Sequence, residues 1–303
     1  MTTSEATMTN YAWTFTKTFH RTPYPAISPS RPELSQAGRT VLVTGGNAGI
    51  GFAIAEAFLQ ASARKVIITG RREEATKQAA AQLGRKYPNA EAVGLVCDIS
   101  DPKSVDELWT SLEKEGTTIN VLALNAVKVP NAKPLLENGI EAIWKDFDVN
   151  VRAQLQMAER LHGQKGKPVT GPRVLINIST FAIHDHKIAG DKPSYGLTKS
   201  AAALAMQLIA QDNAPEELQV INLNPGGVLT QNAKDAGFKE DSYQWNSPEL
   251  PGQFAVWLAS PEASFLHGRF VWTEWDIDEL KSGPIRKRID EDPYFLKVGI
   301  RGL

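Results

Sequence analysis

A tyrosine and a lysine four residues apart, Tyr195 and Lys199, stand at the start of an alanine-rich helical stretch. Residues at i and i+4 lie on one face of an α-helix, so the phenol and the ammonium would be neighbours. A nearby ammonium favours phenolate and is expected to lower the phenol pKa from about 10. Such a phenol can protonate a carbonyl oxygen or deprotonate an alcohol. Because this spacing is common on helix surfaces, the assignment depends on the rest of the chain.

A glycine-rich run at residues 44–51 follows a short apolar segment and opens a helical pattern. Backbone N–H groups at a helix start lack partners and, with the helix dipole, suit a pyrophosphate. Gly45 allows the tight turn, Gly49 admits a phosphate to the backbone, and Gly51 permits close helix–strand packing. With Asn47, these glycines are the predicted phosphate-binding loop.

The next predicted strand, residues 65–69, is followed by Gly70, Arg71 and Arg72. The dinucleotide-binding pattern places a ribose-reading carboxylate near this point for NAD. No carboxylate stands at Gly70, and a guanidinium suits a 2′-phosphate. We therefore predict NADP(H), with Arg71 as its contact. The alternative is that both arginines belong to a solvated helix start.

Two further strand ends carry polar residues. Asp98 follows the predicted strand at 92–97, and Asn125 follows the one at 121–124. Open α/β sheets bind ligands at the carboxyl ends of their strands. We expect Asp98 to accept from the adenine amino group and Asn125 to lie on the cofactor side.

A fifth predicted strand, residues 174–180, ends in two hydroxyl residues, Ser179 and Thr180. Neighbouring strand residues point to opposite faces, so only one of them should face the substrate. Further upstream, Asn150 falls inside a long helical pattern.

Taken in order along the chain, these motifs resemble the short-chain dehydrogenase/reductase family in its single-domain, Tyr-x-x-x-Lys form. The resemblance runs from about residue 38 to 273 and includes the Asn-Pro-Gly-Gly segment at 224–227. It implies that Tyr195 is the acid/base, that Lys199 lowers its pKa and binds the nicotinamide ribose, and that Asn150 holds a relay water. It also implies cofactor contacts from residues spread along the chain: Ile50, Val228, Thr230, Tyr195 and Lys199.

The sequence departs from the family pattern at two places. The fourth strand ends in Asn125-Ala126-Val127, where the family has two asparagines and a glycine. The family's catalytic serine aligns with Thr180, with Ser179 just before it. We therefore assign Thr180 as the catalytic hydroxyl that orients the substrate carbonyl, and Ser179 as a supporting substrate-side residue.

Strands and helices alternate along the chain, which predicts an α/β fold with a doubly wound parallel sheet of the Rossmann type. We divide the chain into an extended N-terminal arm (1–37), the Rossmann domain (38–275) and a C-terminal extension (276–303). The arm is proline-rich, and its aromatic residues suggest that it lies against the body: Tyr11, Trp13, Phe15, Phe19 and Tyr24. Its start and the tail around 268–272 resemble fungal members linked to secondary metabolism.

Composition excludes several classes of partner. A net charge of −1 gives no electrostatic basis for binding nucleic acid or an anionic membrane. No apolar run approaches transmembrane length, and the N-terminus lacks the charged start and apolar core of a secretory signal, so we expect a cytoplasmic protein. Cys97, the single cysteine, is expected to pack as a small hydrophobe. His184-Asp185-His186 lacks a third nearby ligand, so no metal is expected.

The segment from Thr230 to Leu250 carries Phe238, Tyr243 and Trp245. The family resemblance implies that this segment covers the substrate, so its aromatics are candidates to line a pocket for a ring-containing molecule. An ordinary surface loop is the alternative. Trp245, with His184 at the substrate mouth, is our candidate substrate contact.

We therefore expect an NADPH-dependent carbonyl reductase, or alcohol dehydrogenase, for a hydrophobic, polyketide-like or cyclic ketone. Two alternatives stay open. One is a redox-neutral isomerase, dehydratase or cyclase on the same scaffold, and the other is a catalytically silent cofactor-binding protein. The resemblance further implies a homodimer or homotetramer, in which the helices carrying Asn150 and Tyr195 pack against their symmetry mates.

Overall fold

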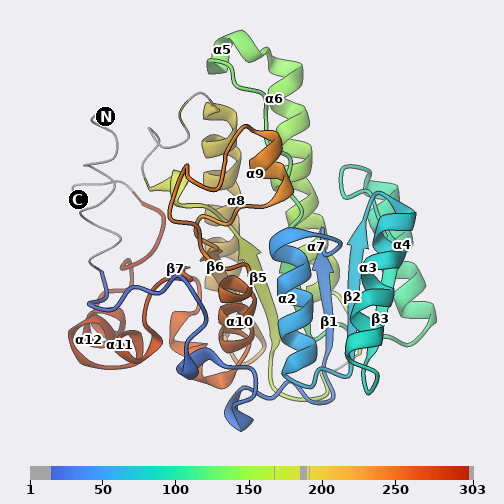
Figure 1. The fold of residues 1–303 in the computed structure, drawn as a ribbon, viewed down its shortest axis with the longest axis vertical. Coiled ribbons are helices and arrows are strands. Elements are labelled where there is room, and N and C mark those ends of the chain that lie inside the picture. The colour runs from blue at the N-terminus through green and yellow to red at the C-terminus, as the bar shows by residue number, and fades with distance from the viewer. Residues whose placement is uncertain (1–14, 167, 185–189, 191, 300–303) are drawn as a thin grey trace.

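Parallel strands form one sheet in the order β3-β2-β1-β4-β5-β6-β7 (Figure 1). The computed structural model describes residues 15–166, 168–184, 190 and 192–299. The strands are β1 (Thr40–Thr44), β2 (Lys65–Gly70), β3 (Glu91–Val96), β4 (Val121–Leu124), β5 (Arg173–Ile178), β6 (Leu218–Asn224) and β7 (Phe270–Trp272). This arrangement confirms the predicted doubly wound parallel sheet.

The connections between the strands are mostly helical. The α-helices are α2 (Gly49–Gln60), α3 (Glu73–Lys86), α4 (Pro102–Lys114), α5 (Leu135–Asn138), α6 (Ile140–Phe147), α7 (Ala153–His162), α8 (Pro193–Asp212), α9 (Gln231–Asp235), α10 (Glu249–Leu258), α11 (Ile277–Lys281) and α12 (Gly283–Glu291). Short 3₁₀ turns lie at Pro25–Ile27, Pro32–Leu34, Phe181–Ile183 and Pro261–Leu266, and a π-helical turn, Asp148–Arg152, joins α6 to α7.

Both faces of the sheet are apolar, because alternate strand residues point to opposite sides and each side is covered by helices. Val41 and Val43 pack into the layer that contains α2, α3 and α10. Leu42, between them, packs into the layer that contains α4, α7 and α8. In Figure 1, α2 and α10 lie side by side across one face of the sheet. These two layers hold the strand ends in fixed positions.

The carboxyl ends of the central strands meet at one edge of the sheet. Thr44 at the end of β1 is level with Thr69 in β2, and Ile178 at the end of β5 is level with Leu223 in β6. In Figure 1, α5, α6 and α9 rise beyond this edge. Every loop that carries a predicted site residue starts here.

The arm packs against the chain that follows β7, as predicted from its aromatic residues. Phe15 stacks on Trp275 with ring centroids 4.1 Å apart. The Tyr24 hydroxyl donates to the Trp275 carbonyl oxygen at 3.0 Å. In Figure 1 the blue arm runs beside the red helices α11 and α12. Tyr11 and Trp13 lie outside the described residues.

Three other expectations concern single features. Cys97 is buried, and burial raises the pKa of its thiol to about 11, in keeping with an inert packing role. In the part of the chain that the structure describes, no three metal-ligating side chains gather, and no helix is long and apolar enough to cross a membrane. Asp185 and His186 fall outside that part.

Candidate active site

The glycine loop is fastened to the end of β4 by Asn125. Its side-chain amide donates to the carbonyl oxygens of Thr44 (3.0 Å) and Gly45 (3.1 Å). Thr44 Oγ1 in turn accepts the backbone N–H groups of Asn125 (2.9 Å) and Ala126 (3.0 Å). A Cβ on Gly51 would collide with the Gly45 carbonyl oxygen, so only glycine allows this packing. Asn125 therefore holds the loop in place, and its predicted direct contact with cofactor stays a prediction.

The start of α2 is open to a ligand. Ala48 precedes the helix and supplies no side-chain cap. Ala48 and Gly49 are exposed, and Ile50 is partly so. The first N–H groups of the helix therefore face solvent, which is the arrangement that binds phosphate.

The ribose end of the predicted site contains Asn47 and Arg71. A Cβ added to Gly70 would lie 2.8 Å from Asn47 Oδ1. The glycine loop and the end of β2 are therefore in contact. Arg71 follows directly, exposed. Asp98 accepts from the backbone N–H (2.9 Å) and hydroxyl (2.7 Å) of Ser100 through Oδ1. The structure therefore brings Asn47 and Arg71 to the same edge, beside the strand that leads to Asp98.

Asn150 is buried in the π-helical turn between α6 and α7. Its amide oxygen accepts the Lys128 backbone N–H, and its amide nitrogen donates to the Lys128 carbonyl, both at 2.9 Å. The same nitrogen donates to Thr198 Oγ1 in α8 at 3.1 Å. A π turn leaves helical backbone groups out of the regular ladder and is frequent at functional sites. Asn150 thus joins the loop after β4 to the helix that carries Tyr195.

The Thr180 side chain lies close enough to the Tyr195 phenol to lower its pKa. Strand β5 ends at Ile178, two residues earlier than the predicted strand, and Thr180 is the N-cap of the 3₁₀ turn that follows. The Ser179 hydroxyl is buried and has no hydrogen-bond partner among the described residues. Thr180, and not Ser179, therefore reaches the tyrosine.

Burial dominates the protonation of both members of the Tyr-x-x-x-Lys pair. It raises the pKa of Tyr195 to about 12, against the Thr180 hydrogen bond, which lowers it. It also lowers the pKa of Lys199 to about 8. The Lys199 ammonium donates to the Ile178 carbonyl at 2.5 Å. The expectation of a depressed phenol pKa is therefore wrong, because desolvation disfavours both charged forms.

The loop after β6 approaches the glycine loop. Thr230 caps α9 by accepting the Ala233 N–H at 3.3 Å, and its methyl would be 3.1 Å from a Cβ on Gly49. Val228, two residues earlier, is buried, and its carbonyl accepts the Thr230 N–H at 2.8 Å. Val228 and Thr230, which the family resemblance implies lie near the nicotinamide amide, therefore stand next to the predicted phosphate loop.

Three aromatic side chains of the predicted substrate segment form a cluster. Tyr243 and Trp245 have ring centroids 5.2 Å apart, and Phe238 lies 5.6 Å and 5.9 Å from them. The Trp245 ring would be 3.7 Å from a Cβ on Gly227, so it lies over the loop that leads to Val228. Phe238 and Tyr243 stay exposed. The rings are therefore placed beside the nicotinamide end of the predicted cofactor site.

His184 is exposed and turns toward β7. Its Nε2 accepts from Trp272 Nε1 at 3.2 Å, and its ring meets the Phe270 ring edge-on at 4.5 Å. Its contact with substrate stays a prediction.

Sequence reasoning missed two buried carboxyl groups near the site. Asp146 accepts from the Ser194 hydroxyl at 2.7 Å, next to Tyr195. Glu274 accepts from the Asn246 amide at 2.7 Å, and a Cβ on Gly226 (φ +72°) would collide with both side chains. Burial raises the pKa of Glu274 to about 7, against the Asn246 hydrogen bond, which lowers it. A carboxylate in a mostly apolar helix was the one available signal for Asp146; nothing marked Glu274.

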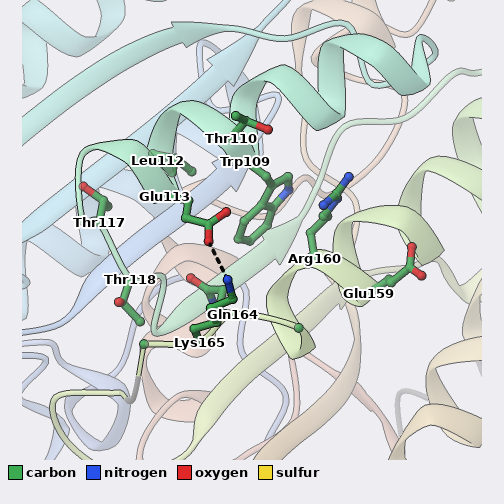
Figure 2. A pocket seen from close by; sticks show the side chains of 13 residues that line it. Trp109, Thr110, Leu112, Glu113, Thr117, Thr118, Glu159, Arg160, Gln164 and Lys165 are labelled. Carbon is green, nitrogen blue, oxygen red and sulfur yellow. Dashed lines mark ion pairs between the residues drawn. The ribbon is translucent and has the colours of Figure 1, made fainter.

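A separate pocket of about 590 Å³ lies at the opposite edge of the sheet (Figure 2). It opens between the ends of α4 and α7, where Glu113 and Lys165 face each other at 3.7 Å. Both side chains are exposed, and none of the predicted catalytic or cofactor residues lines it. It is therefore distinct from the site described above.

Comparison with known proteins agrees with this geometry. The chain is 33% identical over 289 residues to the short chain dehydrogenase/reductase nsrO of Aspergillus novofumigatus, covering 94% of this chain and 96% of that protein. It is 31% identical over 287 residues to a short chain dehydrogenase/reductase of Claviceps purpurea, covering 94% of each.

Solved structures share the fold. The Pseudomonas aeruginosa RhlG/NADP active-site complex superposes with a TM-score of 0.69 at 24% identity, over 80% of this chain and 97% of that one. A chain from Escherichia coli CFT073 complexed with NADPH gives 0.70 at 21% identity, over 80% and 99%. The sequence profile of the short chain dehydrogenase family matches residues 39–241. The chain therefore belongs to the short-chain dehydrogenase/reductase family.

Proposed function

We propose that this protein is an NADP(H)-dependent carbonyl reductase acting on a hydrophobic, cyclic or polyketide-like ketone. The observation that carries the proposal is the Tyr195 hydroxyl. It lies beside the Thr180 side chain, one helical turn from the buried Lys199, at the sheet edge where the glycine loop opens. The same residues would catalyse the reverse oxidation of an alcohol.

The residues at this edge fit a dinucleotide phosphate. The exposed start of α2 would hold the pyrophosphate, and Arg71 would pair with a 2′-phosphate. The buried Lys199 ammonium, whose bond is to the Ile178 carbonyl, would gain ribose hydroxyls as further acceptors. NADP and NADPH in the solved relatives are consistent with this choice. The bound reduced nicotinamide would supply the hydride.

The protein's own part in the reaction is proton transfer and orientation. With its pKa raised to about 12 by burial, Tyr195 is a neutral phenol at pH 7 and can donate its proton to the substrate oxygen. Thr180 would hold that oxygen, and Asn150 would fix the loop through Lys128. Oxidation needs the phenolate instead, so its rate should rise with pH while the rate of reduction changes little from pH 6 to 8.

The aromatic cluster favours a ring-containing substrate. Phe238 and Tyr243 expose large ring surfaces beside the loop that leads to Val228. Apolar pockets with few polar groups are typical of sites for small hydrophobic molecules. Trp245 and His184 are the proposed contacts on either side.

We also propose that the protein is a homo-oligomer. Trp144 in α6 is 58% exposed, and Leu155 in α7 and Leu208 in α8 are 40% and 49% exposed. A groove of about 930 Å³ runs along these helices, and Trp144 and Leu155 line it. Large apolar side chains exposed on neighbouring helices are a feature that interfaces between protein chains share. We propose that a second copy of the chain covers this groove.

Light scattering at micromolar concentration should give at least twice the mass of the chain. Leu155→Glu would place a charge in the groove and should yield a monomer. A monomeric wild-type protein would refute the proposal.

The test of function is NADPH oxidation over a panel of aromatic, cyclic and aliphatic ketones. Tyr195→Phe should bind NADPH normally yet lose the general acid, which is worth about 10²–10⁴ in rate. Undiminished reduction by this variant would refute the role of the tyrosine. Substrate conversion without change in NADPH absorbance would favour a redox-neutral isomerase, dehydratase or cyclase. Cofactor binding with no conversion would favour a silent binding protein.

A further inference from the structure

Asp146 and Asn150, one helical turn apart, both form hydrogen bonds with the first turns of α8, which carry Tyr195. Asn150 donates to Thr198 Oγ1 at 3.1 Å, and that hydroxyl donates to the Ser194 carbonyl at 2.8 Å. Asp146 Oδ2 accepts from the Ser194 hydroxyl at 2.7 Å. The contacts fall one residue before Tyr195 and three residues after it. Residues of α6 and of the π turn therefore contact α8 both before and after Tyr195.

Lys128 contacts both Asn150 and Asp146. Its backbone N–H and carbonyl are bonded to the Asn150 side chain, and its ammonium pairs with Asp146 Oδ1 at 2.8 Å. The Asp146 side chain is 3% exposed, whereas that of Lys128 is 42% exposed. The carboxylate thus sits inside the protein with its charge balanced by a lysine that reaches solvent.

A buried carboxylate is costly unless it is paired and hydrogen-bonded, and Asp146 meets both conditions. Its bond from Ser194 is charge-assisted, and such bonds are about twice as strong as neutral ones. The first turn of α8 needs this support, because Lys192 precedes the helix without giving it a side-chain cap. Helix ends without caps or packing partners fray.

We propose that Asp146 and Ser194, with Lys128 as counter-ion, form a positioning site that holds the Tyr195 hydroxyl in line with Thr180. This inference rests on the proposed reductase function. None of the three side chains need touch the substrate. Their effect passes through the backbone of the first turn of α8.

The predicted kinetic result is a loss of turnover with cofactor binding intact. Displacing a reacting group by about 1 Å can cost up to about a hundredfold in rate. Ser194→Ala and Asp146→Ala should therefore lower kcat for ketone reduction roughly tenfold to a hundredfold, with KM and the NADPH dissociation constant changing less than threefold. Asp146→Asn keeps an acceptor oxygen for Ser194 and should retain more activity than Asp146→Ala.

Hydrogen exchange provides a readout that needs no substrate. In Ser194→Ala, the amides of residues 194–199 should exchange faster than in wild type, while those of the central strands stay unchanged. Glu141→Gln, an exposed acid on the same helix, is the matched control and should change neither measurement.

The outcomes separate this inference from the proposed function. If the wild-type protein reduces no ketone, the proposed function fails, and hydrogen exchange still decides whether Asp146 and Ser194 order the helix start. If ketones are reduced and Ser194→Ala keeps full kcat and wild-type exchange, the positioning site is overturned. Equal losses in kcat and NADPH binding would also overturn it, because they indicate a general structural role.

Discussion

The two halves of the carboxyl edge are built by different means. On the cofactor half, the ends of β1 and β4 are held by backbone groups and two short side chains, Thr44 and Asn125. On the substrate half, three segments far apart in sequence meet beyond the ends of β6 and β7. The first half depends on glycines and on polar side chains next to its own strand ends, and the second on polar side chains from distant segments.

The arm ties the substrate half together. Arg21 donates to the Gln244 carbonyl at 2.6 Å, and its own carbonyl accepts the Ser247 N–H at 2.8 Å. The preceding residue, His20, donates its N–H to the Glu274 carbonyl at 2.8 Å. One short stretch of the arm therefore links the aromatic loop to the chain after β7.

The two halves also differ in their charged groups. His20 Nε2 lies 2.9 Å from Asp276, and Glu274 is buried beside Asn246. The cofactor half contains no buried carboxylate among the residues at the described ends of β1, β2 and β4. Changes of volume should therefore disturb the cofactor half, whereas changes of protonation should disturb the substrate half.

The largest effect on the substrate half should come from the hydroxyl beside Tyr195. Removing one donor that stabilises a reacting oxygen costs about 10²–10³ in turnover. Thr180→Ala should therefore lower kcat by about that factor, with little change in NADPH affinity. Ser179→Ala should stay within a few-fold of wild type, because its buried hydroxyl reaches no described partner. Steady-state kinetics on both variants checks this, and a dead Ser179→Ala with an active Thr180→Ala would reverse the assignment.

Protonation of Glu274 should tie stability to pH. Burial raises its pKa from an ordinary 4.5 to about 7, so the folded protein prefers the neutral carboxyl. That preference is fully present below pH 4.5 and is lost as pH rises to about 7. The stability of wild type relative to Glu274→Gln should fall by about 1.4 kcal/mol per pH unit across this window.

Urea denaturation of both proteins at pH 5, 6 and 7.5 measures this difference. Glu240→Gln, an exposed acid in the same half, is the control and should show no such slope. A constant difference between wild type and Glu274→Gln at all three pH values would contradict the prediction.

Sequence predicted the fold of the cofactor half and its NADP(H) cofactor, because the elements of this half are local. The glycine run, the strand ends and the Tyr195–Lys199 pair are each visible within a few residues. The sheet follows from alternation of apolar strands and helices, and Val41, Leu42 and Val43 show why consecutive residues of a central strand are apolar. Such patterns are set by backbone geometry, which a short segment reveals.

Sequence could not predict the substrate half in the same way. Asp146 meets Ser194 across 48 residues, and Arg21 meets the loop near Asn246 across 225. No periodicity or motif marks such pairs. The phenol pKa was missed for a related reason: spacing showed an ammonium nearby, but desolvation depends on the whole fold.

The smallest expected effect concerns Arg71 in the cofactor half. A hydrogen bond to a charged group contributes roughly 1.5–3 kcal/mol, which corresponds to roughly ten- to a hundredfold in affinity. Arg71→Asp should therefore erase or invert the preference for NADPH over NADH, because the new carboxylate repels a 2′-phosphate and can accept from ribose hydroxyls. Arg85→Asp, on the last turn of α3, is a control for the change in net charge. Fluorescence titration of both cofactors measures the ratio of dissociation constants. Equal dissociation constants for NADPH and NADH in the wild type would show that the exposed Arg71 at the end of β2 does not select the 2′-phosphate. The cofactor half would then bind the cofactor through its backbone alone.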